Sequence, residues 1–97
     1  MDIKLTRENV RKMLEIIKRA TAEIMPMAIP FYEFHRNEVI LEPVFYDIVQ
    51  RLRKKCRKYP EAYRYARILW RRKGIDFEKT YTATQSPFYY YITFEDE

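Results

Sequence analysis

Residues 60–75 read PEAYRYARILWRRKGI, and this stretch predicts a helix with two unlike faces. Proline suits the first turn of a helix, and Glu61 is favourable beside the positive end of the helix dipole. Glycine is a common stop just past the last turn, so Gly74 sets the predicted bounds at residues 60–73. Helical spacing predicts a buried face made of Ala62, Tyr63, Tyr65, Ala66, Leu69 and Trp70.

The other face of this helix carries positive charge only. Arg64, Arg67 and Arg71 follow one another at i, i+3 and i+7 and form an outward stripe. Arg72 lies at the edge of the stripe. The wider segment 51–73 holds eleven Lys and Arg residues and one acid, a net charge of +10. Because the chain of 97 residues carries +5 in total, the rest of it carries −5.

A first helix is predicted from Thr6, a residue that can cap a helix, to about Met25. Opposite charges recur four residues apart along it, as in Glu8 and Lys12, so this helix balances its charge. We therefore expect it to be structural. Its apolar stripe consists of Val10, Met13, Leu14, Ile17, Ala20, Thr21 and Ile24.

Residues 31–43, FYEFHRNEVILEP, follow two helix-stopping prolines and favour extended structure. FYEFH and EVIL each favour a strand, and Arg36 and Asn37 can form a turn between them. A single strand with an irregular approach is the alternative. The segment therefore predicts either a short hairpin or one strand.

A second helix is predicted from Pro43 to about Lys58, with Tyr59 and Pro60 as the break before the next helix. One side of it is apolar, and the other is covered by Lys and Arg. Because Cys56 falls on the apolar side, we expect a buried and unreactive thiol. The apolar side consists of Val44, Phe45, Ile48, Val49, Leu52 and Cys56.

The C-terminal part predicts a β-hairpin with strands over residues 75–82 and 88–95 and a loop at 83–87. On the second strand, Tyr89 and Tyr91 face away from the core side. We expect them to pack or to cover a partner in a homodimer rather than to stack on bases. The predicted core side carries Phe88, Tyr90, Ile92 and Phe94.

The order helix, strand or hairpin, helix, helix, C-terminal hairpin resembles a winged helix-turn-helix domain from Thr6 to Phe94. PEAYRYARILWRRKGI is similar to a recognition helix that leads into the wing. The resemblance implies a single α+β domain over residues 1–97, with three helices, a small antiparallel sheet, and helix 60–73 placed to enter a major groove. The chain departs from the pattern in its long second helix, its short connection without glycine, and a hairpin loop without Lys or Arg.

Charge of one sign attracts polyanions, and the planar guanidinium of arginine suits phosphate and guanine edges. We expect Arg64, Arg67 and Arg71 to face the groove or its backbone. Duplex DNA is favoured over RNA because A-form RNA closes its major groove to side chains. A dimer would span neighbouring half-sites, as a transcription regulator does. The residues expected to steer and hold phosphates are Arg53, Lys54, Arg57, Lys58, Arg72 and Lys73.

The alternative is a protein–protein interaction module, such as a small viral or archaeal factor. Its basic patch would dock an acidic partner, and its Tyr-rich hairpin would mediate dimerisation. High Lys, Arg and Glu content with one glycine is typical of thermophiles, which favours an archaeal source or an archaeal virus.

Residues suited to catalysis are few, with one histidine (His35) and one cysteine. Asp76 and Glu78 are arranged in a way that is similar to the carboxylates of metal-dependent nucleases, but Lys79 falls on the opposite strand face and no third acid is placed. We therefore expect no enzyme activity, no metal and no cofactor.

A single cysteine allows no intrachain disulfide, so we expect a reducing, cytoplasmic compartment, which would be that of the host cell for a viral protein. The N-terminus has no apolar signal region, and no apolar run approaches the length of a membrane span. We therefore expect no secretion and no association with a membrane.

Overall fold

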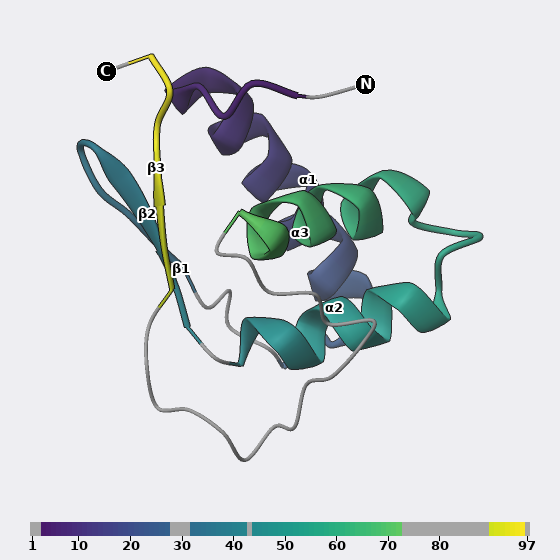
Figure 1. The fold of residues 1–97 in the computed structure, drawn as a ribbon. Helices are drawn as coiled ribbons and strands as arrows, with labels where there is room; N and C mark the ends of the chain where they lie inside the picture. The colour runs from purple at the N-terminus through teal and green to yellow at the C-terminus, as the bar shows by residue number, and fades with distance from the viewer. Residues whose placement is uncertain (1–2, 28–31, 43, 73–89, 97) are drawn as a thin grey trace.

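The computed structural model describes residues 3–27, 32–42, 44–72 and 90–96 (Figure 1). Three helices and a small antiparallel sheet make up the described chain, which confirms the predicted α+β class and the order of elements. The elements are α1 (Arg7–Ile24), β1 (Tyr32–Phe34), β2 (Glu38–Leu41), α2 (Phe45–Lys54), α3 (Pro60–Arg71) and β3 (Tyr90–Thr93).

Helix α1 begins where its sequence predicts. The Thr6 side chain accepts a hydrogen bond from the Asn9 backbone N–H at 3.2 Å, which satisfies one of the free donors of the first turn. The ion pair between Glu8 and Lys12 spans 3.3 Å on the exposed face. The predicted apolar stripe is buried from Val10 to Thr21, and Ile24 is half-buried.

The sheet has the order β1-β2-β3, and both pairs are antiparallel. β1 and β2 form the predicted hairpin, with Phe34 opposite Val39, so the alternative of a single strand is wrong. β3 pairs with β2, placing Ile92 opposite Val39. The sequence predicted residues 75–82 as the partner of this last strand, and those residues lie outside the described part.

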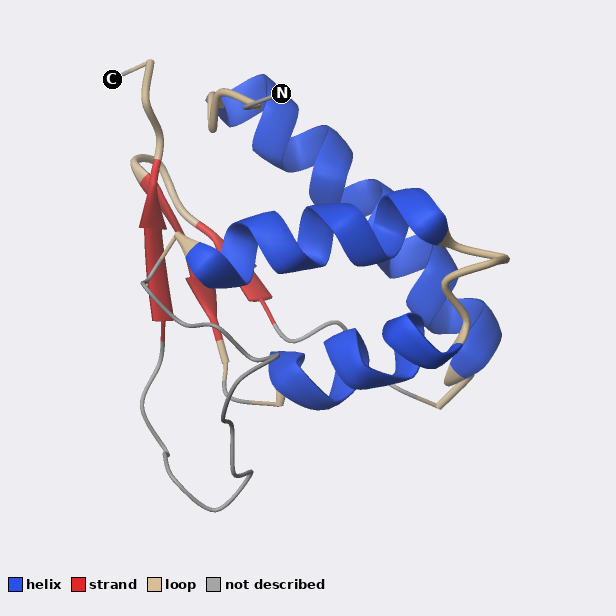
Figure 2. Ribbon diagram, turned by 45° about the vertical axis from the view of Figure 1, so that its right-hand side comes forward, coloured by secondary structure: helices blue, strands red, loops and turns tan. Residues whose placement is uncertain are grey.

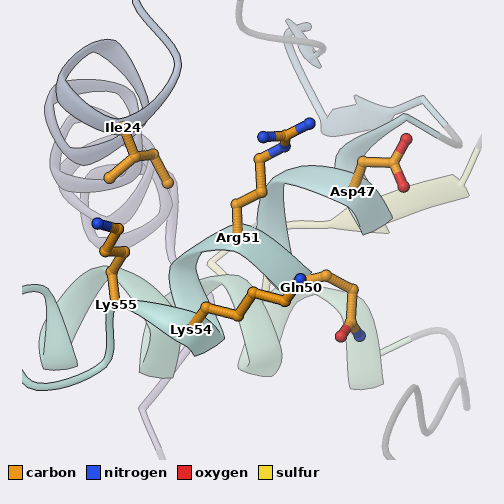
Figure 3. Close-up of a pocket in the computed structure, with 6 residues that line it drawn as sticks. All are labelled: Ile24, Asp47, Gln50, Arg51, Lys54 and Lys55. Carbon is orange, nitrogen blue, oxygen red and sulfur yellow. The ribbon is translucent and has the colours of Figure 1, made fainter.

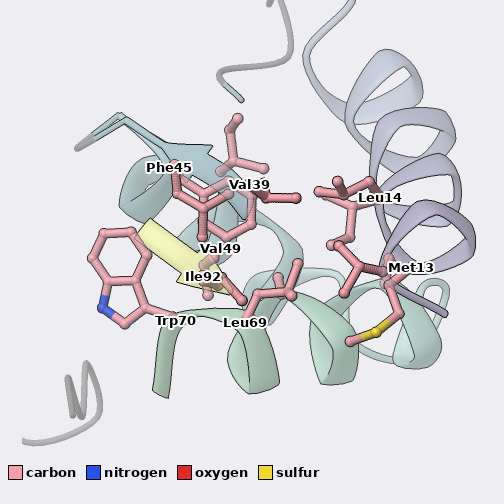
Figure 4. Packing of buried hydrophobic residues seen from close by; sticks show 14 of the residues in the cluster. Met13, Leu14, Val39, Phe45, Val49, Leu69, Trp70 and Ile92 are labelled. Atoms are coloured by element: carbon pink, nitrogen blue, oxygen red, sulfur yellow. The ribbon is translucent and has the colours of Figure 1, made fainter. Parts of the chain in front are cut away.

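The core lies where the three helices and one face of the sheet meet (Figure 4). Trp70 of α3 stacks on Phe45 of α2, with ring centroids 5.8 Å apart and planes inclined by 8°. Ala62 and Ala66 are buried on α3, where their small side chains allow close approach to α1. Helix α3 is therefore held on two sides, by α1 and by α2.

Helix α2 ends at Lys54, four residues before the predicted end at Lys58. The backbone N–H groups of Lys55 and Cys56 bond to carbonyls three residues back, at 3.0 and 3.2 Å, so the last turn tightens and the helix stops. The Cys56 side chain is exposed, and the expectation of a buried thiol is wrong. The physical reason is that its predicted place on the apolar side assumed a helix continuing to Lys58.

The connection between α2 and α3 therefore spans residues 55–59 and is longer than the two-residue break that the sequence predicted. Tyr59 has φ −128° and ψ 56°, outside the helical region, as a residue before proline should be. Figures 1 and 2 show that α2 and α3 run in opposite directions, with this connection at the end of the helices away from the sheet.

The two ends of the described chain are joined beside the sheet. The Glu95 backbone N–H donates to the Leu5 carbonyl at 2.8 Å, and the Arg7 N–H donates to an Asp96 carboxylate oxygen at 3.2 Å. The Arg7 guanidinium also lies over the Phe94 ring, 4.9 Å from its centre. These contacts hold the start of α1 against the end of β3.

Replacing Thr6 by Ala should lower the free energy of unfolding by about 1 kcal/mol, because the N–H of Asn9 loses its acceptor. The measurement is urea unfolding followed by fluorescence of Trp70, the single tryptophan, which is buried in the core. Thr6→Asp, which keeps a capping oxygen, should retain most of the stability. Equal midpoints for Thr6→Ala and the wild type would show that the cap contributes nothing.

Candidate nucleic-acid interface

The richest concentration of positive charge lies at the end of α2 and in the connection after it. Six of the eight residues from 51 to 58 are Lys or Arg, none is acidic, and all six side chains are exposed. This corner lies at the end of the helix pair away from the sheet (Figure 2). We call this set the basic corner: Arg51, Arg53, Lys54, Lys55, Arg57 and Lys58.

Part of this charge has a structural use. Cations near the C-terminus of a helix offset the negative end of its dipole, and each contributes about 0.3–1 kcal/mol. Arg51, Arg53 and Lys54 occupy the last turn of α2, where this effect applies. The dipole amounts to about half an elementary charge and its influence fades within one turn, so it accounts for a small fraction of six cations.

Five of the six cations form no ion pair with a described residue, although Lys55 lies near enough to the Glu23 carboxylate to help lower its pKa. Among the described residues, no carboxylate forms an ion pair with Arg51, Arg53, Lys54, Lys55 or Arg57. Lys58 is the exception, because its ammonium donates to the Glu23 carboxylate of α1. This bond lowers the pKa of Glu23 and raises the pKa of Lys58, as expected when each charge stabilises the other.

The predicted stripe on α3 is interrupted. Arg64 and Arg71 are exposed, but Arg67 is half-buried and its Nε atom is out of contact with solvent. At 100° per residue, Arg67 stands about 60° from Arg64, on the side of the helix where Trp70 packs against α2. The stripe therefore presents two exposed guanidinium groups, about 10 Å apart along the axis, rather than three in a row.

The two exposed arginines of α3 belong to different ends of the molecule. Arg64 is close to the basic corner in the chain, in the first half of the helix. Arg71 and Arg72 lie at the other end, where they line a hollow of about 450 Å³ together with residues 3–5 and Glu95. Arg72 is paired with the Glu95 carboxylate at 2.8 Å. The cationic half of the sequence therefore forms one corner, followed in the chain by Arg64 on the first half of α3, and a separate pair near the sheet.

Of the nine residues predicted to meet nucleic acid, four are exposed with no ion pair among the described residues and lie at or next to the corner: Arg53, Lys54, Arg57 and Arg64. Lys58 and Arg72 are paired, Arg67 is half-buried, and Arg71 lies at the far end. Lys73 falls outside the described residues. Sequence reasoning left Arg51 and Lys55 out, although they belong to the continuous run RLRKKCRK.

The other candidate residues offer few groups for catalysis or metal binding within the described structure. His35 Nε2 lies 3.1 Å from a Glu33 carboxylate oxygen, as a shared strand face predicts, and both side chains are exposed. Within the described ranges, no three His, Cys, Asp or Glu side chains gather as metal ligands would. Asp76, Glu78 and Tyr89 lie outside those ranges. Of the helices described, none is long and apolar enough to cross a membrane.

Comparison with protein-family models, with curated proteins and with solved structures finds no match for this chain. The resemblance to winged helix-turn-helix domains therefore remains a prediction from the order of elements and from residues 60–75.

The stability of the fold should depend on pH through the carboxylate of Glu95. Its carboxylate accepts the Leu5 backbone N–H and the Arg72 guanidinium, and both bonds lower its pKa below the ordinary value of 4.5. A carboxylate with a lowered folded-state pKa stabilises the fold fully above the unfolded-state value, and the contribution is lost as pH falls through the folded-state value. Protonation of Glu95 at low pH should therefore weaken the contacts between the two ends of the described chain.

We expect Glu95→Gln to lose less stability than the wild type between neutral pH and about pH 3, since it lacks the titrating group. Urea unfolding at several pH values measures this difference. Glu15→Gln is the matched control, because it removes an exposed carboxylate that makes no hydrogen bond to the described residues. If Glu95→Gln and the wild type lose stability in parallel below pH 4.5, the role assigned to Glu95 is wrong.

Proposed function

We propose that this protein binds nucleic acid, with duplex DNA as the favoured form, through the basic corner and Arg64. The observation that carries the proposal is a run of five exposed cations within residues 51–57, with no acid in the run and no ion pair to the described residues. Nucleic acid is the polyanion that such a surface attracts most strongly, because its phosphates place charges at short and regular spacing.

A role in solubility alone explains the corner less well. Helix α1 shows how this protein builds a solvated face, with acids and bases mixed along it and an ion pair between Glu8 and Lys12. Side chains three residues apart on a helix are neighbours, and Arg51 and Lys54 of α2 carry like charges at that spacing, so they repel each other. Repulsion of this kind is relieved when an anion binds.

The geometry favours contacts to phosphate over contacts to bases. Helix α3 packs against both α1 and α2, and only Arg64 projects from its first half beside the corner. Contacts to phosphate position a protein on DNA but carry no sequence information, so we expect binding that tolerates sequence changes and falls steeply with salt.

Duplex DNA is the favoured form because the winged-helix resemblance implies a helix near a major groove, and the B-form groove admits a helix whereas the A-form groove does not. Binding to DNA would place the protein inside a cell. Regulation of transcription is the use that the winged-helix resemblance implies, and it requires a dimer that spans two half-sites. Neither the dimer nor this use is needed for the binding itself.

Binding of a fluorescently labelled duplex over a range of salt concentrations tests the proposal. The six cations Arg51, Arg53, Lys54, Lys55, Arg57 and Arg64 should give a slope of log K against log salt of about −5, and a loss of affinity of about a thousand-fold between about 50 and 200 mM salt. The triple variant Arg53→Ala, Arg57→Ala, Arg64→Ala should bind at least about tenfold more weakly, with a slope less steep by about 3.

The matched control removes three exposed cations elsewhere, with Lys12, Lys18 and Arg36 each replaced by Ala. Its net charge equals that of the test variant, so a difference between the two depends on position and not on total charge. The proposal is wrong if the folded wild-type protein fails to bind duplex near 50 mM salt, or if the two triple variants bind equally. Retained Trp70 fluorescence shows that each variant is folded.

A further inference from the structure

A hollow of about 410 Å³ lies on the side of the basic corner that faces α1. Its volume is within the range of ligand sites in proteins. It lies between the end of α1 and the outward side of α2 (Figure 3). Arg51, Lys54 and Lys55 contribute the positive charge of its wall, and Asp47 contributes the single acid. Ile24, the last residue of α1, forms its apolar side.

Two of these cations share one side of the hollow. Figure 3 shows the side chains of Arg51, on α2, and of Lys55, just after it, rising on the side where Ile24 lies, while Lys54 extends in another direction. Both residues line the same hollow and carry like charges, so they repel each other. Asp47 does not relieve this repulsion, since no ion pair joins Asp47 to Arg51 in the described structure.

The backbone offsets part of this charge. The C-terminal ends of α1 and α2 both lie at the hollow, and α1 has no basic residue in its last turn. Each helix end carries about half a negative elementary charge, so the two ends together amount to about −1. The lining residues and the two helix ends therefore leave a net charge of about +1, and Glu23, which interacts electrostatically with Lys55, is itself paired with Lys58.

From this residual charge and shape we infer that the hollow holds one backbone phosphate of the bound nucleic acid. Arg51 and Lys55 would contact its oxygens, and the Ile24 side chain would form the floor beside them. This inference rests on the proposed function and adds to it a defined phosphate position at the junction of α1 and α2. The other predicted contacts, from Arg53, Arg57 and Arg64, lie outside the hollow.

The double variant Arg51→Ala, Lys55→Ala tests this assignment on the full chain, with labelled duplex as the probe. We expect weaker binding and a salt slope less steep by about 2, because two counterions fewer are released. The control pair Lys12→Ala, Lys18→Ala has the same net charge and should keep the wild-type slope. In the wild type, the Ile24 methyl NMR signals should shift on addition of duplex more than those of Ile16 or Ile40.

Failure of this inference can be told apart from failure of the proposed function. If the wild type binds duplex and the double variant keeps the wild-type slope, the hollow holds no phosphate, and the proposed function stands on Arg53, Lys54, Arg57 and Arg64 alone. If the folded wild type binds no duplex, both are wrong. Pyrophosphate is the second probe. If the Ile24 methyl signals shift with pyrophosphate but not with duplex, the hollow binds a small phosphate compound, and its role in nucleic-acid binding is wrong.

Discussion

The peptide bond between Tyr59 and Pro60 constrains the molecule more than any other single feature. The proline ring keeps Tyr59 out of the helical region, so α2 cannot continue into α3. The chain must turn before it, and the tightened turn after Lys54 provides the reversal. Because the two helices then run in opposite directions, α3 can place Trp70 against Phe45 and complete the core.

The turn after Lys54 also determines where the cationic side chains lie. Had α2 continued to Lys58, the run RLRKKCRK would have wound around a helix, with part of it directed toward the core. Ending the helix at Lys54 leaves Lys55, Cys56 and Arg57 in an exposed connection. The corner therefore combines a helix end with a reversing segment, and its charges are held together by the fold of the backbone rather than by ion pairs.

Local features of the fold could be predicted because they depend on neighbours in the sequence. The Thr6 cap, the α1 stripe and the hairpin turn at Arg36 and Asn37 each involve residues within a few positions of one another. The end of α2 was misplaced because the competition between helix and turn at residues 55–58 is settled by how the chain must reach α3. The place of Cys56 followed from that error.

The candidate site was predicted in part for the same reason. The charge run is visible in the sequence, but its neutralisation is not, because Lys58 meets Glu23 from 35 residues away and Arg72 meets Glu95 from 23 residues away. The exposure of Arg67 likewise depends on where α2 packs against α3. The sequence shows the run of cations, and long-range contacts decide which of them form ion pairs with the described residues.

Mapping backbone amide NMR shifts as duplex DNA is added tests the central claim most directly, because it reports on the whole chain at once. The account predicts that the largest shifts fall on residues 51–57 and on Arg64, while the outer face of α1 around Lys12 stays nearly unchanged. Largest shifts at Arg71, Arg72 and the N-terminal residues 3–5, or no shifts at all in low salt, would contradict it.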